Sequence, residues 1–448
     1  MDYAEAVHYL QTLGRELASP SHTRAQKFDL GNIRLLATGL GDPQRRFRSI
    51  HIAGTNGKGS TAAMMESILR RGSYRTGLYT SPHLERINER IRLNGAEIGD
   101  AEFAAAFSRL GTLIEKMLST GELSAHPTFF ECMTAMAFDV FARESVDFAV
   151  LEVGMGGRLD ATNIVKPEVC AITQIAFDHE NFLGHSIEQI AGEKAGIVKS
   201  GVAVVSAAGD PSAREVIRSR AAEVGAPFVE IDEAYGVEIL SKPGGFYSAV
   251  VTDRRDAKQI ALDLPLAGRY QVRNAVTALA VARILAERGS TSLDDQAIVG
   301  GIAAVRWPGR LDRVGEGPAV YLDGTHNPAG ARELAAFWDE NFAGRRIYLV
   351  YGAVRDKAVD EVAGVLFPRA TKVFITAAKQ PRAISAEALA EMTGHLSADL
   401  EAVPEPGMAL ERALAVAQPE DTVFVTGSLY LVGDLRRWWR ARAPSTAR

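Results

Sequence analysis

The sequence predicts an α/β protein of two domains, each built around a mainly parallel β-sheet that helices cover. Short apolar runs rich in β-branched residues alternate along the chain with longer segments of helical pattern. This alternation is typical of parallel strands that are joined by crossover helices. A chain of 448 residues also exceeds the usual size of a single hydrophobic core. We therefore expect one domain at residues 1–304 and a second at residues 305–448.

The first series of elements fills most of the N-terminal domain. Its strand candidates are short and dominated by apolar side chains, and its helix candidates lie between them. The expected strands are Ser49–Ala53, Thr76–Thr80, Phe148–Val153, Val169–Gln174 and Val202–Ala207. The expected helices are Ala62–Arg71, Asp100–Leu118, Phe129–Glu144 and Ile187–Val198.

A change of pattern precedes the second series. Residues Phe246–Leu264 favour antiparallel strands with Asp253–Asp256 near the turn, and the alanine-rich Tyr270–Gly289 predicts a long helix closed by glycine. Alternation then resumes after Ala304. The expected strands are Val320–Asp323, Ile347–Tyr351, Lys372–Thr376 and Thr422–Thr426, and the expected helices are Pro328–Asn341, Val359–Phe367, Ala386–Thr393 and Leu429–Arg440. Residues Ala443–Arg448 are expected to form a frayed tail.

The composition excludes several classes of partner. Hydrophobic residues make up 47% of the chain and charged residues 23%, which is typical of a soluble globular protein. The net charge of −5 gives no reason to expect nucleic acid or an anionic membrane. The chain shows no secretory signal and no apolar stretch long enough to span a membrane. Cys132 and Cys170 lie in apolar runs and are expected to be buried thiols in a reducing cytoplasm.

The first strand candidate runs directly into a glycine-rich turn, which a helix-forming segment follows. From His51 to Thr61 the sequence reads His-Ile-Ala-Gly-Thr-Asn-Gly-Lys-Gly-Ser-Thr. Glycines let backbone N–H groups approach phosphate oxygens, the helix N-terminus adds positive potential, and the lysine reaches the terminal phosphates. The turn predicts a site for a nucleoside triphosphate on a P-loop-type sheet. The candidate phosphate ligands are Gly54, Thr55, Asn56, Gly57, Lys58, Gly59 and Ser60.

This turn departs from the standard G-x-x-x-x-G-K-[ST] pattern at two positions. Ile52 stands where the first glycine belongs, and Gly59 stands where a metal-binding hydroxyl would follow Lys58. The departure raises the question of whether Ser60 alone supplies that hydroxyl. A glycine-rich turn with a lysine by chance is the structural alternative.

Other chemical groups stand at the ends of later strands and in one helix. Glu152 could hold Mg²⁺ or cap a glycine-rich turn, and His179 could be a metal ligand, a general base or a structural residue. Lys194 lies between two glycines in a helical pattern, as either an active-site lysine or part of a Glu–Lys surface. Asp323 and His326 flank a tight turn before a proline-started helix, where Asn327 is also expected to be the N-cap.

Taken together, these motifs resemble the folylpolyglutamate synthase and dihydrofolate synthase family, which belongs with the Mur peptide ligases. The matching motifs occur in the family's order over most of the chain. They are His51–Ser60, Tyr79–Leu84, Leu151–Asn163, Asp178–His179 with Leu183–Gly184, Gly192–Gly196, Trp307–Arg310 and Leu322–Asn327. The resemblance implies a smaller, Rossmann-like α/β C-terminal domain. It also implies that ATP phosphorylates a pterin-containing carboxylate and that the amine of L-glutamate then attacks the acyl phosphate.

The resemblance assigns roles to individual residues. It implies that Lys58, Lys194 and His326 serve catalysis and that Asn274, Arg310 and Asp323 contact ATP. Ser81 and Glu152 would hold a first Mg²⁺ and His179 a second, with Ser81 supplying the hydroxyl that is absent after Lys58. Lys194 matches a family lysine that becomes carbamylated, and a monovalent cation is a further expected cofactor.

The acceptor is expected to be dihydropteroate, a folate or both, bound by Thr128, Phe130 and Asp160. Phe130 could stack on the pterin ring or simply pack in the helix core, and Asp160 could accept from pterin N–H groups. The expected partners are these small molecules, L-glutamate and ATP, with a monomeric chain.

Three other functions are also compatible with these motifs. A cell-wall Mur ligase shares the loop, but it usually carries a separate N-terminal substrate domain, for which the 53 residues before Gly54 leave no room. A P-loop ATPase without ligase activity and a non-catalytic nucleotide-binding module are further alternatives. Phosphate release with and without glutamate and a pterin acid would separate them.

Overall fold

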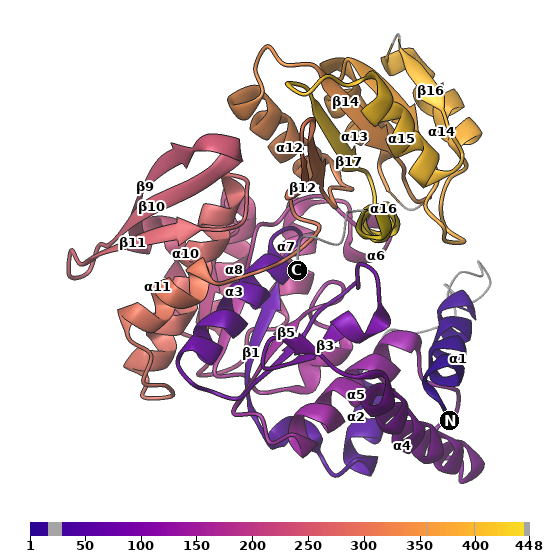
Figure 1. Ribbon diagram of the computed structural model, residues 1–448. Helices are drawn as coiled ribbons and strands as arrows, with labels where there is room; N and C mark the ends of the chain where they lie inside the picture. The colour runs from indigo at the N-terminus through magenta and orange to yellow at the C-terminus, as the bar shows by residue number, and fades with distance from the viewer. Residues whose placement is uncertain (17–28, 356, 398, 443–448) are drawn as a thin grey trace.

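The computed structural model describes residues 1–16, 29–355, 357–397 and 399–442 (Figure 1). The predicted tail at residues 443–448 lies outside the described residues. Figure 1 shows two α/β bodies, with the C-terminal one, coloured orange to yellow, lying above the N-terminal one. The predicted α/β class with mostly parallel sheets is confirmed.

An eight-stranded sheet forms the frame of the N-terminal body. Its order is β4-β3-β2-β5-β1-β6-β7-β8, and all neighbours from β2 to β8 run parallel. Its strands are β1 Arg48–Ala53, β2 Thr76–Tyr79, β3 Ile91–Leu93, β4 Ala96–Glu97, β5 Phe148–Glu152, β6 Val169–Ile172, β7 Ala203–Ser206 and β8 Phe228–Glu230. The near-continuous apolar sequence of β5 matches its burial on both faces, and β1 is buried as well although it includes Ser49 and His51.

Helices cover both faces of this sheet, as the alternating pattern predicts. The helices of this part are α1 Tyr3–Glu16, α2 Gly31–Gly39, α3 Lys58–Arg71, α4 Asp100–Ser119, α5 Phe129–Arg143, α6 Glu180–Leu183, α7 Ile187–Ala195, α8 Pro211–Glu223 and α9 Ile231–Ala234. Short 3-10 turns lie at Pro43–Arg45, Ile87–Arg90 and Ala161–Ile164. The sequence patterns did not predict α1 or α2.

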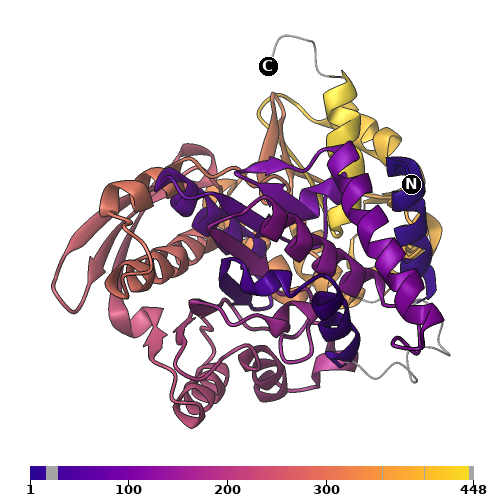
Figure 2. The ribbon, with the colours of Figure 1, turned by 90° about the horizontal axis from the view of Figure 1, so that it is seen from below.

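A three-stranded antiparallel sheet and two helices complete the first body. The sheet has the order β11-β10-β9, with β9 Tyr235–Lys242, β10 Phe246–Asp253 and β11 Gln259–Leu264. The buried residues of β10 and β11 alternate with exposed ones and pack on the core beneath α10 Tyr270–Glu287 and α11 Asp295–Ala303. Figure 2 shows this sheet at the end of the molecule opposite the N-terminus.

The C-terminal body holds a six-stranded sheet of order β12-β13-β17-β14-β15-β16, parallel except at β12. Its strands are β12 Asp312–Glu316, β13 Ala319–Leu322, β14 Ile347–Tyr351, β15 Lys372–Ile375, β16 Leu400–Ala402 and β17 Thr422–Thr426. Its helices are α12 Pro328–Asn341, α13 Val359–Leu366, α14 Ala386–Thr393, α15 Pro406–Val416 and α16 Leu429–Arg442. Separate apolar clusters lie on its two faces.

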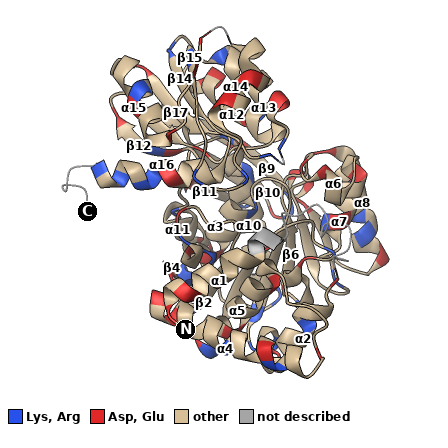
Figure 3. Cartoon of the chain, turned by 90° about the vertical axis from the view of Figure 1, so that its right-hand side faces the viewer, with Lys and Arg blue, Asp and Glu red and all other residues tan. Residues whose placement is uncertain are grey.

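Helix α16 ties the two bodies together. Its arginines face the loop after β2, where the guanidinium of Arg437 donates to the Glu85 carbonyl at 2.9 Å and Arg440 lies 3.2 Å from the Glu85 carboxylate. Gly433 lies so close to this loop that a Cβ atom there would be 1.9 Å from the Leu84 carbonyl oxygen. Only glycine permits that approach. Figure 3 shows the concentration of Lys and Arg on α16.

Candidate active site between the two domains

The predicted site residues gather at the carboxyl ends of β1, β5 and β6, with the turn after β13 of the second domain above them. This is the edge of a parallel sheet at which α/β proteins bind ligands. Asn56 and Asn327 join the two domains directly, because each amide nitrogen donates to the other side chain's oxygen, at 3.2 and 2.9 Å. The site therefore lies between the domains.

The glycine-rich loop has the geometry of a phosphate cradle. Gly54 and Gly57 have φ angles of 149° and 89°, a backbone conformation that favours glycine. Helix α3 starts at Lys58, so its free N–H groups open toward the loop. Thr55 is held by the neighbouring strand end, where its hydroxyl donates to the Ala176 carbonyl at 3.0 Å. These contacts hold the loop in the shape of a phosphate cradle.

The structure gives a physical reason for the missing hydroxyl after Lys58. A Cβ atom at Gly59 would lie 3.1 Å from Nε1 of the Trp307 indole. A serine or threonine at this position would require that ring to shift by a few tenths of an ångström. Trp307 is held in turn by the Arg92 guanidinium, 5.0 Å from its ring centre.

Two lysines converge on one carbonyl oxygen of the loop. Lys58 Nζ donates to the Gly54 carbonyl at 3.1 Å, and Lys194 Nζ, from α7, donates to the same oxygen at 2.8 Å. Lys194 is buried, and this burial, with Lys58 as the second cause, lowers its pKa to about 7. Burial also lowers the pKa of Lys58. Lys194 therefore lies buried against the glycine-rich loop and is not part of an exposed Glu–Lys surface.

Glu152 and Ser81 meet at the ends of β5 and β2. The Glu152 carboxylate accepts a hydrogen bond of 3.0 Å from the Ser81 backbone N–H. Glu152 is buried, and desolvation raises its pKa while the nearby Lys58 opposes that shift. A buried carboxylate beside a phosphate loop is a suitable ligand for a hard cation, which completes its shell with nucleotide oxygens.

Asp178 is the charged centre of the domain interface. Lys357 Nζ, from the second domain, donates to Asp178 Oδ1 at 2.7 Å and lies 3.2 Å from His179 Nε2. His326 Nε2 and Asn327 Nδ2 approach the other carboxylate oxygen at 3.9 and 3.5 Å. Although burial opposes it, the attraction of Lys357 and the two histidines lowers the pKa of Asp178.

The turn after β13 presents His326 toward this centre. Asp323 fixes the turn because its carboxylate accepts from the backbone N–H groups of Leu311 and Thr325, at 2.9 and 3.0 Å. His326 Nδ1 lies 2.7 Å from the Gly324 carbonyl. A carbonyl oxygen only accepts, so Nδ1 carries the proton and Nε2 has a free lone pair. Burial is the main cause that lowers the pKa of His326 to about 4.

Two further predicted nucleotide contacts lie beside the loop. A Cβ at Gly57 would be 2.3 Å from Asn274 Oδ1, so the Asn274 side chain lies against the cradle. Arg310 packs against the turn after β13, where a Cβ at Gly324 would be 2.3 Å from its guanidinium. After burial, its charge is a further cause that lowers the pKa of Lys58, and it opposes the rise that burial causes in the pKa of Glu152. As predicted, the Asn327 side chain also caps α12 by accepting from the Gly330 N–H at 2.8 Å.

The three predicted pterin residues come together beneath the glycine-rich turn that follows β5. A Cβ at Gly154 would lie 2.4 Å from the Phe130 ring, which is itself only partly buried. Thr128 is the N-cap of α5, and its oxygen accepts from the Glu131 N–H at 3.2 Å. Its hydroxyl proton remains available for a ligand.

Asp160 has a structural role that the sequence motif did not reveal. Its Oδ2 accepts from the N–H groups of Gly154 and Met155, both at 3.0 Å. Its Oδ1 accepts from the N–H and hydroxyl of Thr162. Both oxygens are thus engaged within one loop, which Asp160 holds in shape.

A metal ion bound at this site would need oxygen ligands in addition to protein side chains. Within the described parts of the chain, no three His, Cys, Asp or Glu side chains converge on one point. Glu152 with Ser81 and His179 with Asp178 form two separate partial sets. Such sets fit Mg²⁺, which binds through few protein ligands together with nucleotide phosphates and water.

Sequence reasoning missed two members of the site. Lys357 stands in a segment without a glycine-rich or strand-end signal, and nothing local indicates that it reaches across to Asp178. Arg90, which is buried and perturbs Glu152, also has no motif of its own. The only indication of Lys357 in the sequence was that a lysine stands a few residues after β14.

Comparison with known proteins agrees with this geometry. A family model described as the Mur ligase middle domain matches residues 52–282, and one described as the glutamate ligase domain of Mur ligases matches residues 309–429. The fold and site thus define an ATP-dependent, amide-forming ligase of the Mur class.

Relatives that match over both domains identify one family within this class. The dihydrofolate synthase/folylpolyglutamate synthase of Bacillus subtilis (strain 168) is 37% identical over 412 residues, which is 91% of this chain and 94% of that protein. The folylpolyglutamate synthase of Lacticaseibacillus casei is 34% identical over 98% of both chains. The structure of E. coli FolC in complex with DHPP and ADP superposes with a TM-score of 0.86, at 31% identity over 99% of both chains. The chain belongs to the folylpolyglutamate and dihydrofolate synthase family.

Proposed function

We propose that this chain joins L-glutamate to the terminal carboxylate of dihydropteroate and of folates, with conversion of ATP to ADP and phosphate. The observation that carries the proposal is the meeting of Lys58 and Lys194 on the Gly54 carbonyl, beside Glu152 and opposite His326. Groups that suit phosphate binding, from the first domain, and a group that suits acyl transfer, from the second, thus face the same space between the domains.

The residues suit two successive steps. An oxygen of the acceptor carboxylate attacks the γ-phosphorus, the bond to ADP breaks, and Lys58 stabilises charge on the transferred group. The glutamate amine then attacks the acyl carbon, and the tetrahedral intermediate releases phosphate and leaves the amide. The free lone pair on His326 Nε2 accepts a hydrogen bond from that amine. Asn274, Arg310 and Asp323 complete the nucleotide site.

Mg²⁺ would bind Ser81 and Glu152 at one position and His179 at a second. Bound there with ATP, it would neutralise phosphate charge. Lys357 already contacts Asp178 and His179, so a second ion would share that space with its ammonium group. We also include a monovalent cation among the proposed cofactors.

Lys194 is proposed to act as a carbamate. CO₂ adds to a neutral amine, and burial together with Lys58 makes the neutral form of Lys194 accessible near pH 7. The product is an anion beside Lys58 and the proposed metal position, which replaces repulsion by attraction.

Thr128, Phe130 and Asp160 are proposed to form the pterin pocket, with Phe130 as the stacking surface and Asp160 as the residue that shapes the turn. Use of both acceptors is supported by the B. subtilis relative, whose name includes both activities. We further propose a monomer in the cytoplasm, with the domain boundary at 304/305. No helix among the described residues is long and apolar enough to cross a membrane.

Phosphate release tests this proposal. We expect release only when ATP, L-glutamate and either dihydropteroate or tetrahydrofolate are all present, with formation of an amide product of matching mass. Release that is independent of glutamate and of the pterin acid would show an ATPase instead. Activity with one acceptor alone would restrict the function to that acceptor.

A further inference from the structure

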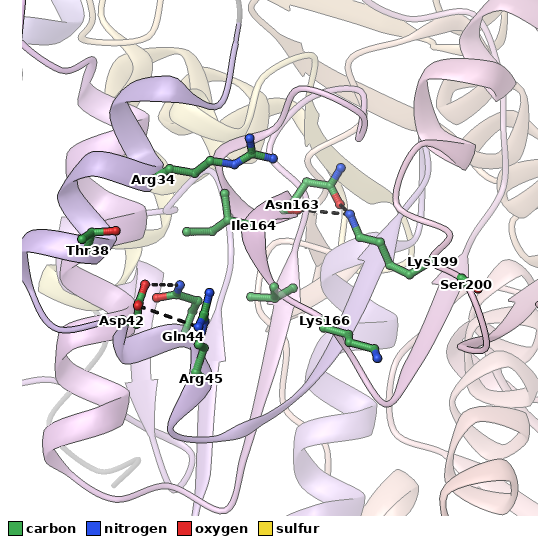
Figure 4. Close-up of a pocket in the computed structure, with 11 residues that line it drawn as sticks. Arg34, Thr38, Asp42, Gln44, Arg45, Asn163, Ile164, Lys166, Lys199 and Ser200 are labelled. Atoms are coloured by element: carbon green, nitrogen blue, oxygen red, sulfur yellow. Dashed lines mark hydrogen bonds and ion pairs between the residues drawn. The ribbon is translucent and has the colours of Figure 1, made fainter. Parts of the chain in front are cut away.

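A second cavity lies at the opposite edge of the large sheet from the phosphate loop. It has a volume of about 520 Å³ and lies at the amino ends of β1, β6 and β7 (Figure 4). Three chain segments supply its walls, namely residues 34–45, 163–166 and 199–200. The proposed ligase function uses none of them.

Positive charge is concentrated in this cavity. Arg34, Arg45, Lys166 and Lys199 line it, together with a single carboxylate, Asp42. A net charge of about +3 at one cavity contrasts with the −5 of the whole chain. Residues 17–28, which lie outside the described structure, contain no Asp or Glu and so supply no neutralising side chain.

The cations have few partners of their own. Arg45 and Asp42 are 4.0 Å apart, whereas neither Arg34 nor Lys166 has an ion pair or side-chain hydrogen bond among the described residues. Lys199 Nζ donates only to neutral oxygens, the Asn163 carbonyl at 3.2 Å and Asn163 Oδ1 at 2.7 Å. Burial, with Arg34 among the further causes, lowers the pKa of Lys199.

Two of the cations extend toward the same residue of the cavity wall, Asn163. Figure 4 shows Arg34 and Lys199 extending toward Asn163 from opposite sides of the cavity. Thr38, Gln44 and Ser200 add neutral donors on its walls. Guanidinium forks and ammonium groups around such a space match the oxygens of a multiply charged oxyanion. We propose that this cavity binds a dianionic phosphate group, either inorganic phosphate or a phosphate monoester.

This site is connected to the ligase centre by direct hydrogen bonds. Asn163, which Lys199 holds, donates from Nδ2 to the Arg158 carbonyl at 3.0 Å and to the Gly196 carbonyl at 3.2 Å. Arg158 belongs to the turn that Asp160 shapes, and Gly196 caps the helix that carries Lys194. An anion that draws Lys199 from Asn163 therefore acts on both segments, so the site is regulatory.

The test measures phosphate binding with the nucleotide site blocked. Wild-type protein saturated with Mg²⁺ and a non-hydrolysable ATP analogue is titrated with inorganic phosphate at constant ionic strength by calorimetry. Arg34→Gln/Lys166→Gln is the pocket variant, because both side chains are exposed and unpaired and their loss leaves folding intact. Lys116→Gln/Arg254→Gln is the matched control, since it removes the same charge from exposed, unpaired positions elsewhere.

We expect a Kd at or below about 1 mM for the wild type and the control, and binding at least about tenfold weaker for the pocket variant. Equal binding by all three proteins, or no saturable binding by the wild type, overturns the proposal. A second titration with glycerol phosphate distinguishes the two candidate ligands. Tighter binding of glycerol phosphate than of inorganic phosphate indicates a phosphate monoester, and weaker binding indicates the free ion. These titrations do not depend on ligase activity.

Hydrogen exchange tests the connection to the centre. Phosphate is expected to change amide exchange in residues 158–163 and 194–199 of the wild type and the control, but not of the pocket variant. Binding without that change would contradict the regulatory role.

Discussion

Lys58 is a proposed catalytic residue whose own contacts are few. Its ammonium group donates to the carbonyls of Gly54 and Thr55, and burial lowers its pKa, so losing its buried charge offsets the loss of its attraction to Glu152. We expect Lys58→Ala to reduce amide formation by at least about a thousandfold, as loss of a group that stabilises transferred charge implies. The thermal transition should stay close to that of the wild type. Turnover near the wild-type rate would remove Lys58 from the mechanism.

Lys194 connects stability with pH. Its pKa is lowered to about 7 in the folded protein from an ordinary value of 10.5. The unfolded chain therefore binds more protons between these values, and stability rises with pH across this window. The free energy of unfolding is reduced by the full effect of this shift below about pH 7, and the reduction vanishes as the pH rises through 10.5.

This linkage predicts the behaviour of Lys194→Met in CO₂-free buffer. The variant should melt at a higher temperature than the wild type at pH 6.5, and the difference should shrink at pH 9, as calorimetry can measure. It should also be nearly inactive, and bicarbonate should raise the activity of the wild type alone. A lower melting temperature for the variant at pH 6.5 would mean that the ammonium is not destabilised there.

At the scale of residues, some roles could be predicted from the sequence and others could not. The roles of Gly54 and Gly57 follow from the motif, because a phosphate loop needs positive φ angles. The double engagement of both Asp160 oxygens does not, because it depends on how Gly154, Met155 and Thr162 fold back on the carboxylate. Its assignment to the pterin stays a prediction.

At the scale of elements, the strands with continuous apolar sequence were predictable and the interface partners were not. β5 and β14 were located to within a residue, because buried parallel strands have a strong local pattern, and β1 was located equally well although it includes Ser49 and His51. α1 has a helical pattern, with Ala6, Leu10 and Leu13 buried on one face, that our predictions did not include, and α2 is only nine residues long. The Asp178–Lys357 pair joins residues 179 positions apart and is set by the packing of two domains.

Lys357 is expected to hold the domains together. Its side chain and that of Asp178 are 9% and 11% exposed, and truncation of one partner of such a pair leaves a buried charge uncompensated. We expect Lys357→Met to lower the free energy of unfolding by about 3 kcal/mol. Lys379→Met is the control, because Lys379 pairs with Glu405 on the surface and its loss should cost less than about 1 kcal/mol. Equal losses in urea unfolding would contradict the buried role.

At the scale of the whole molecule, the proposed mechanism depends on two domains that contribute to one site. The first contributes the phosphate loop, Glu152 and Lys194, and the second contributes His326, Lys357 and Arg310. In the proposed mechanism both sets are required, because the first holds the phosphates and the second faces the incoming amine. The order of the sequence motifs indicated both sets except for Lys357, whereas their convergence on Asp178 required the structure.

The central claim is that the acceptor carboxylate becomes an acyl phosphate, and an oxygen label tests it most directly. Dihydropteroate carrying ¹⁸O in its carboxylate is converted with ATP and L-glutamate, and the released phosphate is examined by mass spectrometry. Attack of a carboxylate oxygen on the γ-phosphorus predicts one ¹⁸O atom in each phosphate, since the acyl C–O bond breaks in the second step. Phosphate that carries no label from the acceptor would contradict the acyl-phosphate mechanism.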